Sequence, residues 1–334
     1  MLLNMDDFLD DTLRQELVRR LHEHIDRFPN KIRDRVRNYI VSTQGKMLRP
    51  LLVVGTAKIL GATPEQMEIA YTSGVSVELL HNFTLMHDDI LDKAPLRRGK
   101  DSYHIKHGLE LAIHDGDIVH SFALTFINDI DSLKLMLEIS NLVGIGNAME
   151  LEDRLDDVYN FNKEHVIEVL KLKTAIVFYG CVQLAGIAVK KTGLTEDLKD
   201  IITDGGIAFQ IQDDILDILG ETEKFGKQSF WDIQESKRNL FLYYSLQTEH
   251  AEKLKEIYSK PVGEKTEEDV KFVLSIFKTV KDKIIADRDN FLESCLNRLD
   301  EKIEKLPKNE SSGQLKQLYE FLRELIIYLC TREK

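Results

Sequence analysis

The sequence predicts an all-α protein built as a single domain over residues 1–334, and three observations support this. The chain has only 6 prolines and 18 glycines, which favours long helices over a turn-rich β protein. Apolar residues recur at the 3.6-residue period of a helix, while alternating strand patterns and composition shifts typical of domain boundaries are absent. A hydrophobic content of 43% suffices for a sizeable core.

The first clear helix is expected to begin after Thr63. Thr63, Pro64 and Gln66 are the residue types of an N-cap, a first helical position and the third position of a capping box. The helical pattern runs from there to Asp92, and Pro95 closes it because the residue before a proline avoids the helical conformation. The pattern predicts a helix of about 28 residues, roughly 40 Å long.

Two further helix starts and one linker are expected along the chain. Residues 195–197, Thr-Glu-Asp, are expected to open a helix that ends at Gly220. Residues 266–269, Thr-Glu-Glu-Asp, are expected to cap another helix. The polar segment 308–313 is typical of a linker before a last helix.

The pentapeptide Asp-Asp-Ile-Leu-Asp occurs twice, at residues 88–92 and 213–217, each time inside an apolar run typical of a helix. The first and last aspartates of each copy are four residues apart and share a helix face, where like charges repel. Such a cluster among apolar residues needs a compensating cation, and its carboxylate oxygens suit Mg²⁺ shared with phosphate. Two copies therefore favour two carboxylate walls that hold magnesium around a phosphorylated substrate over two solvated acidic patches.

Basic residues accompany both motifs. They are Lys46, Arg49, Arg97, Arg98, Lys173, Lys227 and Lys237. Lys46 and Arg49 are three residues apart and share one face if the segment is helical. Lysine as a point charge and arginine as a bidentate fork suit diphosphate groups. Together with the two magnesium motifs, these residues predict a cavity that binds two diphosphates.

Composition and charge exclude several classes of function. The net charge of −12 argues against nucleic acid as a main partner. No apolar run approaches the roughly 20 residues of a membrane span, and the acidic start lacks the features of a signal peptide. Three cysteines without metal-ligand spacing indicate a reducing compartment. We therefore expect a cytoplasmic protein.

The motifs and their order resemble those of the trans-isoprenyl (E-polyprenyl) diphosphate synthases, and most of all the archaeal-type short-chain geranylgeranyl diphosphate synthases. The matching elements are Gly-Lys-x-x-Arg-Pro (45–50), the first aspartate motif with Arg-Arg-Gly (88–99), Gly-Asp-Ile (116–118), Lys-Thr (173–174), Phe-Gln before the second aspartate motif (209–217) and Gly-Lys-x4-Asp-Ile-x3-Lys (226–237). The resemblance implies the isoprenoid synthase fold, an antiparallel helix bundle around a deep central cavity with the two motifs on facing walls, usually in a homodimer.

The resemblance also implies a reaction and a role for each residue. A prenyltransferase of this kind condenses isopentenyl diphosphate with an allylic diphosphate (dimethylallyl, geranyl or farnesyl) head to tail, by magnesium-triggered ionisation, and releases diphosphate. About three Mg²⁺ ions per active site are implied. The implied metal ligands are Asp88, Asp89, Asp92, Asp213, Asp214, Asp217 and Glu150. The implied catalytic residues are Lys173, Thr174, Gln210 and Lys227. The implied substrate-binding residues are Lys46, Arg49, His81, Arg97, Arg98, Lys237 and Phe83.

Product length is expected to depend on Phe83, five residues and roughly 7.5 Å before Asp88 along the helix axis. By resemblance, one aromatic residue at this position beside the small Thr84 implies a C20 product, geranylgeranyl diphosphate, with farnesyl (C15) and longer products as alternatives. The other interpretation is that Phe83 only packs between helices.

One departure from the family pattern leaves a further alternative. The family's Gly-Gln-x-x-Asp reads here as Gly146-Asn147-Ala148-Met149-Glu150, which we interpret as a compensated pair in an active enzyme. A non-catalytic partner subunit is the alternative.

A terpene cyclase would carry Asn-Asp-x-x-Ser-x-x-x-Glu as its second motif, which this chain does not. A di-iron site would need a second Glu-x-x-His unit besides Glu78–His81.

Overall fold

The computed structural model describes residues 11–43, 45–153, 162–219, 232–307 and 312–332. The chain forms two compact units. The first unit comprises Met1–Ser140, Val177–Asp200 and Leu299–Glu324, and the second comprises Asn141–Ile176, Ile201–Arg298 and Leu325–Lys334. The expectation of a single domain over residues 1–334 stays a prediction.

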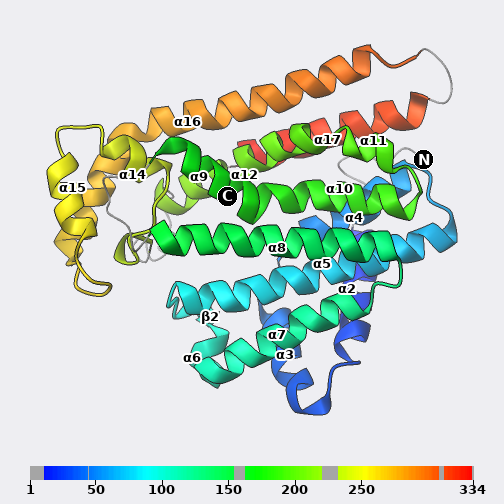
Figure 1. The fold of residues 1–334 in the computed structure, drawn as a ribbon, viewed down its shortest axis with the longest axis horizontal. Coiled ribbons are helices and arrows are strands. Elements are labelled where there is room, and N and C mark those ends of the chain that lie inside the picture. Colours follow the sequence, from blue (N-terminus) through cyan, green and yellow to red (C-terminus); the bar gives the residue numbers. More distant parts are fainter. Residues whose placement is uncertain (1–10, 44, 154–161, 220–231, 308–311, 333–334) are drawn as a thin grey trace. The chain divides into compact units, whose positions relative to one another are not determined.

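Helices make up most of the described chain (Figure 1), which confirms the all-α fold class. The first helices in chain order are α2 (Asp11–Ile25), α3 (Asn30–Ser42), α4 (Leu48–Ile59), α5 (Pro64–Leu91), α6 (Tyr103–His107), α7 (Leu109–Thr125) and α8 (Ile130–Asp153). They are followed by α9 (Lys163–Leu170), a π-helical turn η2 (Lys171–Ala175), α10 (Ile176–Ala188), α11 (Thr192–Glu196), α12 (Lys199–Leu219), α14 (Leu240–Ser245), α15 (Ala251–Tyr258), α16 (Glu267–Glu304) and α17 (Gly313–Thr331). Among the described residues, the strands are β1 (Leu96–Arg97) and β2 (Lys100–Asp101).

Helix α5 begins and ends as the sequence predicts. The hydroxyl of Thr63 accepts a hydrogen bond from the Gln66 backbone N–H (3.3 Å), and the Gln66 side chain accepts one from the Thr63 N–H (2.9 Å). The helix spans 28 residues and has Asp92 as its C-cap. It packs against α4 and α7 (Figure 1), so the first aspartate motif lies at the C-terminal end of a central helix of the first unit.

The expected helix start at residues 195–197 is wrong by a few residues, because α12 begins at Lys199. Thr195 lies inside the short helix α11, where its hydroxyl bonds the Gln183 side chain and lies 3.0 Å from the Thr192 carbonyl oxygen, so it does not cap α12. The expected end at Gly220 lies outside the described residues.

The start of α16 is confirmed. Thr266 and Asp269 bond each other's backbone N–H groups with their side chains, at 3.1 and 2.8 Å. Within the predicted linker, residues 308–311 lie outside the described part, and α17 begins at Gly313.

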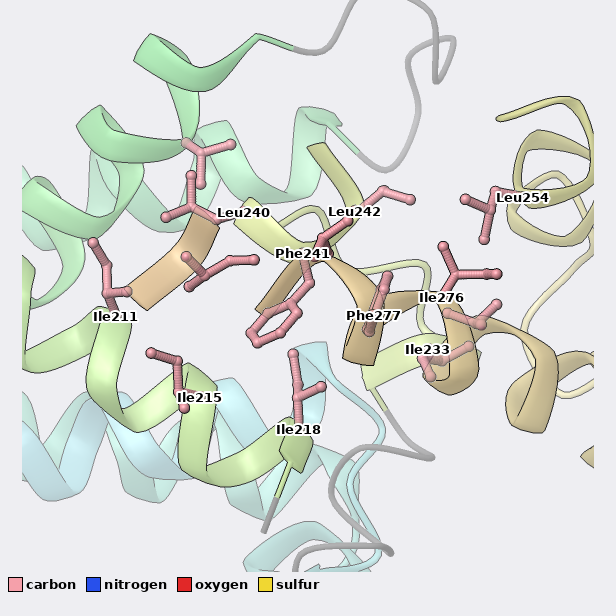
Figure 2. Close-up of a cluster of buried hydrophobic side chains, with 14 of the residues drawn as sticks. Ile211, Ile215, Ile218, Ile233, Leu240, Phe241, Leu242, Leu254, Ile276 and Phe277 are labelled. Carbon is pink, nitrogen blue, oxygen red and sulfur yellow. The ribbon is translucent and has the colours of Figure 1, made fainter. Parts of the chain in front are cut away.

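The core of the second unit fixes the orientation of α12. Ile211, Ile215 and Ile218 project from one side of α12 toward a cluster that includes Phe241 and Phe277, whose ring centroids are 5.4 Å apart (Figure 2). Burying this apolar side leaves the opposite side of α12 for polar residues, since side chains four and seven apart share a face.

None of the helices in the described residues is both long enough and apolar enough to span a membrane.

Candidate active site

The middle aspartate of the first motif differs from its neighbours in burial. Asp89 is fully buried, and its Oδ1 accepts hydrogen bonds from Nε (2.9 Å) and Nη2 (2.5 Å) of Arg97. The hydroxyl of Tyr39 lies 3.4 Å from its other oxygen. Burial raises the pKa of the Asp89 carboxyl, and the Arg97 guanidinium opposes that rise. Asp88 and Asp92 are four residues apart on another face of α5 and are only partly buried.

A two-residue turn positions the arginines that follow the first motif. Leu96 and Arg97 pair with Asp101 and Lys100 in an antiparallel hairpin. The turn residues Arg98 and Gly99 have φ angles of 52° and 79°, the positive values that a tight hairpin turn of this length favours. Gly99 adopts such a φ easily because it has no Cβ. A hairpin therefore holds Arg97 against the motif.

Arg98 turns toward the segment before α4. Its Nη1 donates a hydrogen bond to the Thr43 carbonyl oxygen. A Cβ at Gly45 would lie 2.8 Å from its Nη2, so glycine at that position leaves room for the guanidinium. This contact gives a physical reason for the first residue of the Gly-Lys-x-x-Arg-Pro element.

Arg49 and His81 meet next to these arginines. Nη1 of Arg49, in the first turn of α4, lies 3.3 Å from Nε2 of His81 on α5. Burial lowers the pKa of His81 well below its usual value, and the nearby cations Arg49 and Arg98 lower it further. The imidazole is therefore neutral at pH 7 and can accept from Arg49. The positive charge of this cluster suits an anion such as a diphosphate.

Lys46 does not share a helical face with Arg49. Met47 is the N-cap of α4 with a φ of 57°, and the helix begins at Leu48, so Lys46 lies outside it. The side chain of Lys46 is exposed next to Gly45.

Phe83 packs toward α7. Its ring lies 4.6 Å from that of His87, one turn further along α5, and 4.8 Å from that of His120 on α7. Close approach between the helices is possible at Gly116, where a Cβ would lie 2.4 Å from Nε2 of His87. The aromatic residue before the first motif thus contributes to the contact between α5 and α7.

In the second motif, the three aspartates lie on different sides of α12. Asp213 and Asp217 lie opposite the buried isoleucines, whereas Asp214 lies at the edge of the apolar side. Nε2 of Gln210 donates to Asp214 (3.0 Å). Burial raises the pKa of Asp214 to about 6, and the ammonium group of Lys237 opposes that rise. Lys237 thus lies within electrostatic reach of this motif, while Lys227 lies outside the described residues.

The Lys-Thr element lies in the π-helical turn η2. Such a turn carries one extra residue and is frequent at functional sites. The hydroxyl of Thr174 donates to Oε1 of Gln210 (2.9 Å), which joins η2 to the second motif. At Gly206 of α12, a Cβ would lie 2.6 Å from Cα of Ala175, so only glycine permits this close packing.

Lys173 forms an ion pair with Glu150, the residue that stands where the family pattern has Asp. Its Nζ hydrogen-bonds Oε2 of Glu150, which is buried on α8. At Gly146, one turn earlier on α8, a Cβ would lie 2.9 Å from Cγ of Lys173. Oδ1 of Asn147 is buried and has no hydrogen-bond partner among the described residues. The longer Glu150 side chain therefore keeps a carboxylate at Lys173.

Sequence reasoning missed two residues that bind the motifs. Tyr39 contacts Asp89 from α3, and Arg332, directly after α17, forms an ion pair with Asp213. Each lies far along the chain from its partner and in an ordinary amphipathic context, so no local signal in the sequence indicates either contact.

No three His, Cys, Asp or Glu side chains of the described residues are grouped closely enough to hold a metal ion by themselves. Each motif instead presents a pair of outer aspartates, Asp88 with Asp92 and Asp213 with Asp217, one helical turn apart. This donor set fits Mg²⁺, which takes one or two carboxylates and completes its octahedron with water and substrate phosphate.

Comparison with known proteins gives consistent matches over most of the chain. The profile of the family described as Polyprenyl synthetase matches residues 30–277. The geranylgeranyl diphosphate synthase of Saccharolobus solfataricus is 34% identical over 240 residues, which cover 68% of this chain and 70% of that protein.

Solved structures share the fold. The crystal structure of a geranylgeranyl pyrophosphate synthase has 27% identity and a TM-score of 0.81, covering 97% of this chain and 99% of that one. The polyprenyl synthase of Caulobacter crescentus, solved with calcium and isoprenyl diphosphate, has 24% identity and a TM-score of 0.78, covering 96% of this chain and 98% of that one. The expected isoprenoid synthase fold class is confirmed.

Proposed function

The chain belongs to the polyprenyl synthetase family and is a short-chain trans-prenyltransferase, and we propose that it condenses isopentenyl diphosphate with allylic diphosphates to form geranylgeranyl diphosphate. The observation that carries this proposal is the pair of Asp-Asp-Ile-Leu-Asp motifs, each held on a helix with its outer aspartates on one face and with basic residues beside it.

The second aspartate motif and its basic partners are proposed to act on the allylic diphosphate. Lys173 and Lys237 would bind its oxygens and so stabilise the charge that develops when the C–O bond breaks. Glu150 orients Lys173 through their ion pair. The hydroxyl oxygen of Thr174, fixed by its bond to Gln210, would face the allylic cation with its lone pairs. Lys227 is proposed for the same role as Lys237 on family resemblance alone.

In the first unit, Arg49 and Arg98 are proposed to bind the diphosphate of isopentenyl diphosphate, with Lys46 as a further cation. His81 would remain neutral and hold the guanidinium of Arg49 in place. Arg97 is proposed to complete charge neutralisation on the allylic diphosphate while its bond to Asp89 fixes its orientation.

Divalent metal ions supply further neutralisation of the leaving diphosphate when they are bound. The residues proposed to hold Mg²⁺ are Asp88, Asp92, Asp213 and Asp217, with Asp89 and Asp214 in support. Glu150 is proposed to contribute a carboxylate through water. The number of ions, about three, follows from family resemblance.

The C20 product is proposed on two grounds. The relative from Saccharolobus solfataricus is a geranylgeranyl diphosphate synthase. Phe83 is the one aromatic residue five positions before Asp88 and packs against α7, where it would stop a growing chain.

We also propose a cytoplasmic homodimer. Exposed apolar side chains recur on one face of α8, at Ile130, Leu137 and Ile145, which is the pattern of a face covered by a partner. Three buried cysteines, all free thiols, suit a reducing compartment.

The test is to incubate the purified chain with isopentenyl diphosphate, Mg²⁺ and each allylic starter in turn, and to size the products. We expect C20 as the main product from every starter. If the chain alone yields no prenyl diphosphate but does so with a second subunit, the partner-subunit alternative replaces this proposal. A main product of another length refutes the C20 assignment and leaves the reaction intact.

A further inference from the structure

Arg332 directly follows α17 and lies against the second aspartate motif. Its Nη2 forms an ion pair with Oδ1 of Asp213, and the two side chains are only 17% and 29% exposed. Its guanidinium carbon lies 4.8 Å from the ring centroid of Phe209, one turn earlier on α12. The cation therefore contacts the helix at the first aspartate of the motif.

The backbone of Arg332 is fixed as well as its side chain. Nε2 of Gln212 donates to the Arg332 carbonyl oxygen (2.9 Å), and Oε1 of Gln212 accepts from Arg288 on α16 (2.6 Å). Exposed ion pairs contribute little because water screens them and the side chains must be ordered. Here the ordering is already provided by the backbone contact, and the pair is largely shielded from water.

The carboxylate of Asp213, which pairs with Arg332, is also a candidate ligand for a metal ion. Asp213 and Asp217 are one helical turn apart, and their charges repel unless a cation lies beside them. The guanidinium of Arg332 provides such a cation on an oxygen of Asp213. That oxygen cannot accept from Arg332 and coordinate a divalent ion in the same direction, so the two cations exclude each other there.

We propose that Arg332 is an internal counter-ion of the second aspartate motif that competes with divalent metal for Asp213. The proposal rests on the assignment of Asp213 as a metal ligand. Arg332 stabilises the motif in the metal-free protein and leaves Asp213 when metal binds. Its Nε, which is buried and has no hydrogen-bond partner among the described residues, gives the released guanidinium a further donor for an anion.

The experiment measures Mn²⁺ binding to the full chain without any diphosphate, by the electron paramagnetic resonance signal of free Mn²⁺. Arg332→Gln is expected to tighten the dissociation constant roughly three- to tenfold, the factor that corresponds to the net contribution of one typical hydrogen bond. The matched control is Arg323→Gln, which removes an arginine within α17 that is paired with Asp300, and it is expected to leave Mn²⁺ binding unchanged. Melting in EDTA supplies a second readout, where Arg332→Gln is expected to lower the melting temperature by roughly 2–4 °C.

A double-mutant cycle separates the proposal from the function it rests on. Asp213→Asn should weaken Mn²⁺ binding, and Arg332→Gln should have no further effect in that background. If Asp213→Asn weakens binding but Arg332→Gln changes nothing in the native background, the competition is refuted while the metal assignment holds. If Asp213→Asn leaves binding unchanged, the metal assignment of Asp213 fails and the counter-ion proposal fails with it.

Discussion

The two aspartate motifs contain the same five residues in the same order, yet their middle aspartates have different partners. Asp89 is fully buried and forms two hydrogen bonds to the charged guanidinium of Arg97. Asp214 is bonded to the neutral amide of Gln210, and its pKa is raised to about 6. Burial raises the pKa of both carboxyl groups. At Asp89 the guanidinium of Arg97 opposes that rise at hydrogen-bond distance, whereas at Asp214 the rise is opposed by the charge of Lys237 and by the amide of Gln210.

The outer aspartates differ as well. Asp213 forms an ion pair with Arg332, a residue 119 positions further along the chain. In the first unit, the arginine that follows the motif bonds the middle aspartate instead, because the hairpin turn at Arg98 and Gly99 directs Arg97 to Asp89. The same pentapeptide thus binds its arginine at a different position in each unit.

The largest effect is expected from the outer aspartates. Asp88→Ala and Asp213→Ala should each lower turnover by roughly 100-fold or more at saturating Mg²⁺, because each removes a carboxylate that would hold charge-neutralising metal at the leaving group. Circular dichroism checks that the fold persists. Asp200→Ala, in the exposed first turn of α12, is the control and should retain normal turnover. Normal turnover in either motif variant excludes a mechanism that needs both motifs.

The middle aspartates should respond to neutralisation with opposite signs. Asp89→Asn leaves Arg97 partly buried without its carboxylate and should destabilise the protein by about 3–5 kcal/mol. Asp214→Asn should instead stabilise the metal-free protein by about 3 kcal/mol at pH 7.5, since it removes a carboxyl group that is unfavourable to ionise in the folded state.

The effect of Asp214→Asn on folding stability should depend on pH. Its folded pKa of about 6 exceeds the usual 3.8, so the native state holds more protons than the unfolded state between these values. The gain in stability from Asp214→Asn should therefore vanish below about pH 4, grow as the pH rises and level off above about pH 6. Urea unfolding in EDTA at several pH values measures it. A gain that does not vary with pH contradicts the assigned pKa.

A smaller effect is expected at the ion pair between Glu150 and Lys173. Glu150→Gln removes the charge that orients Lys173 and should lower turnover roughly tenfold. The control is Glu152→Gln, two residues further along α8 and exposed. If both variants keep native turnover, Glu150 has no role in catalysis.

Substitution of Phe83 is expected to change the turnover rate least, but to change the chain length of the product. Phe83→Ala removes the ring between His87 and His120 and should shift the products from C20 to longer chains. Chromatography of the products measures the shift. An unchanged distribution in a folded Phe83→Ala variant supports the alternative that Phe83 serves only to pack α5 on α7.

Much of the fold and of the candidate site could be predicted from local sequence. The capping box of Thr63 and Gln66 defines the start of α5, because its two hydrogen bonds form within one helical turn. Periodicity alone also predicts that Asp88 and Asp92 share a face, as do Asp213 and Asp217. The start of α12 was not predictable in this way. Threonine is a residue type that often caps helices, but the Thr195 side chain bonds Gln183 on another helix.

The sequence by itself determined the all-α fold class, the two aspartate motifs and the family to which the chain belongs, since each depends on residues close together along the chain or on their order. The tertiary structure alone decided which aspartate is buried and which cation it meets. Tyr39 reaches Asp89 from 50 positions away and Arg332 reaches Asp213 from 119. The ionisation of a carboxyl group depends on the dielectric environment and charges within a few ångströms, and packing sets these independently of the five residues around it.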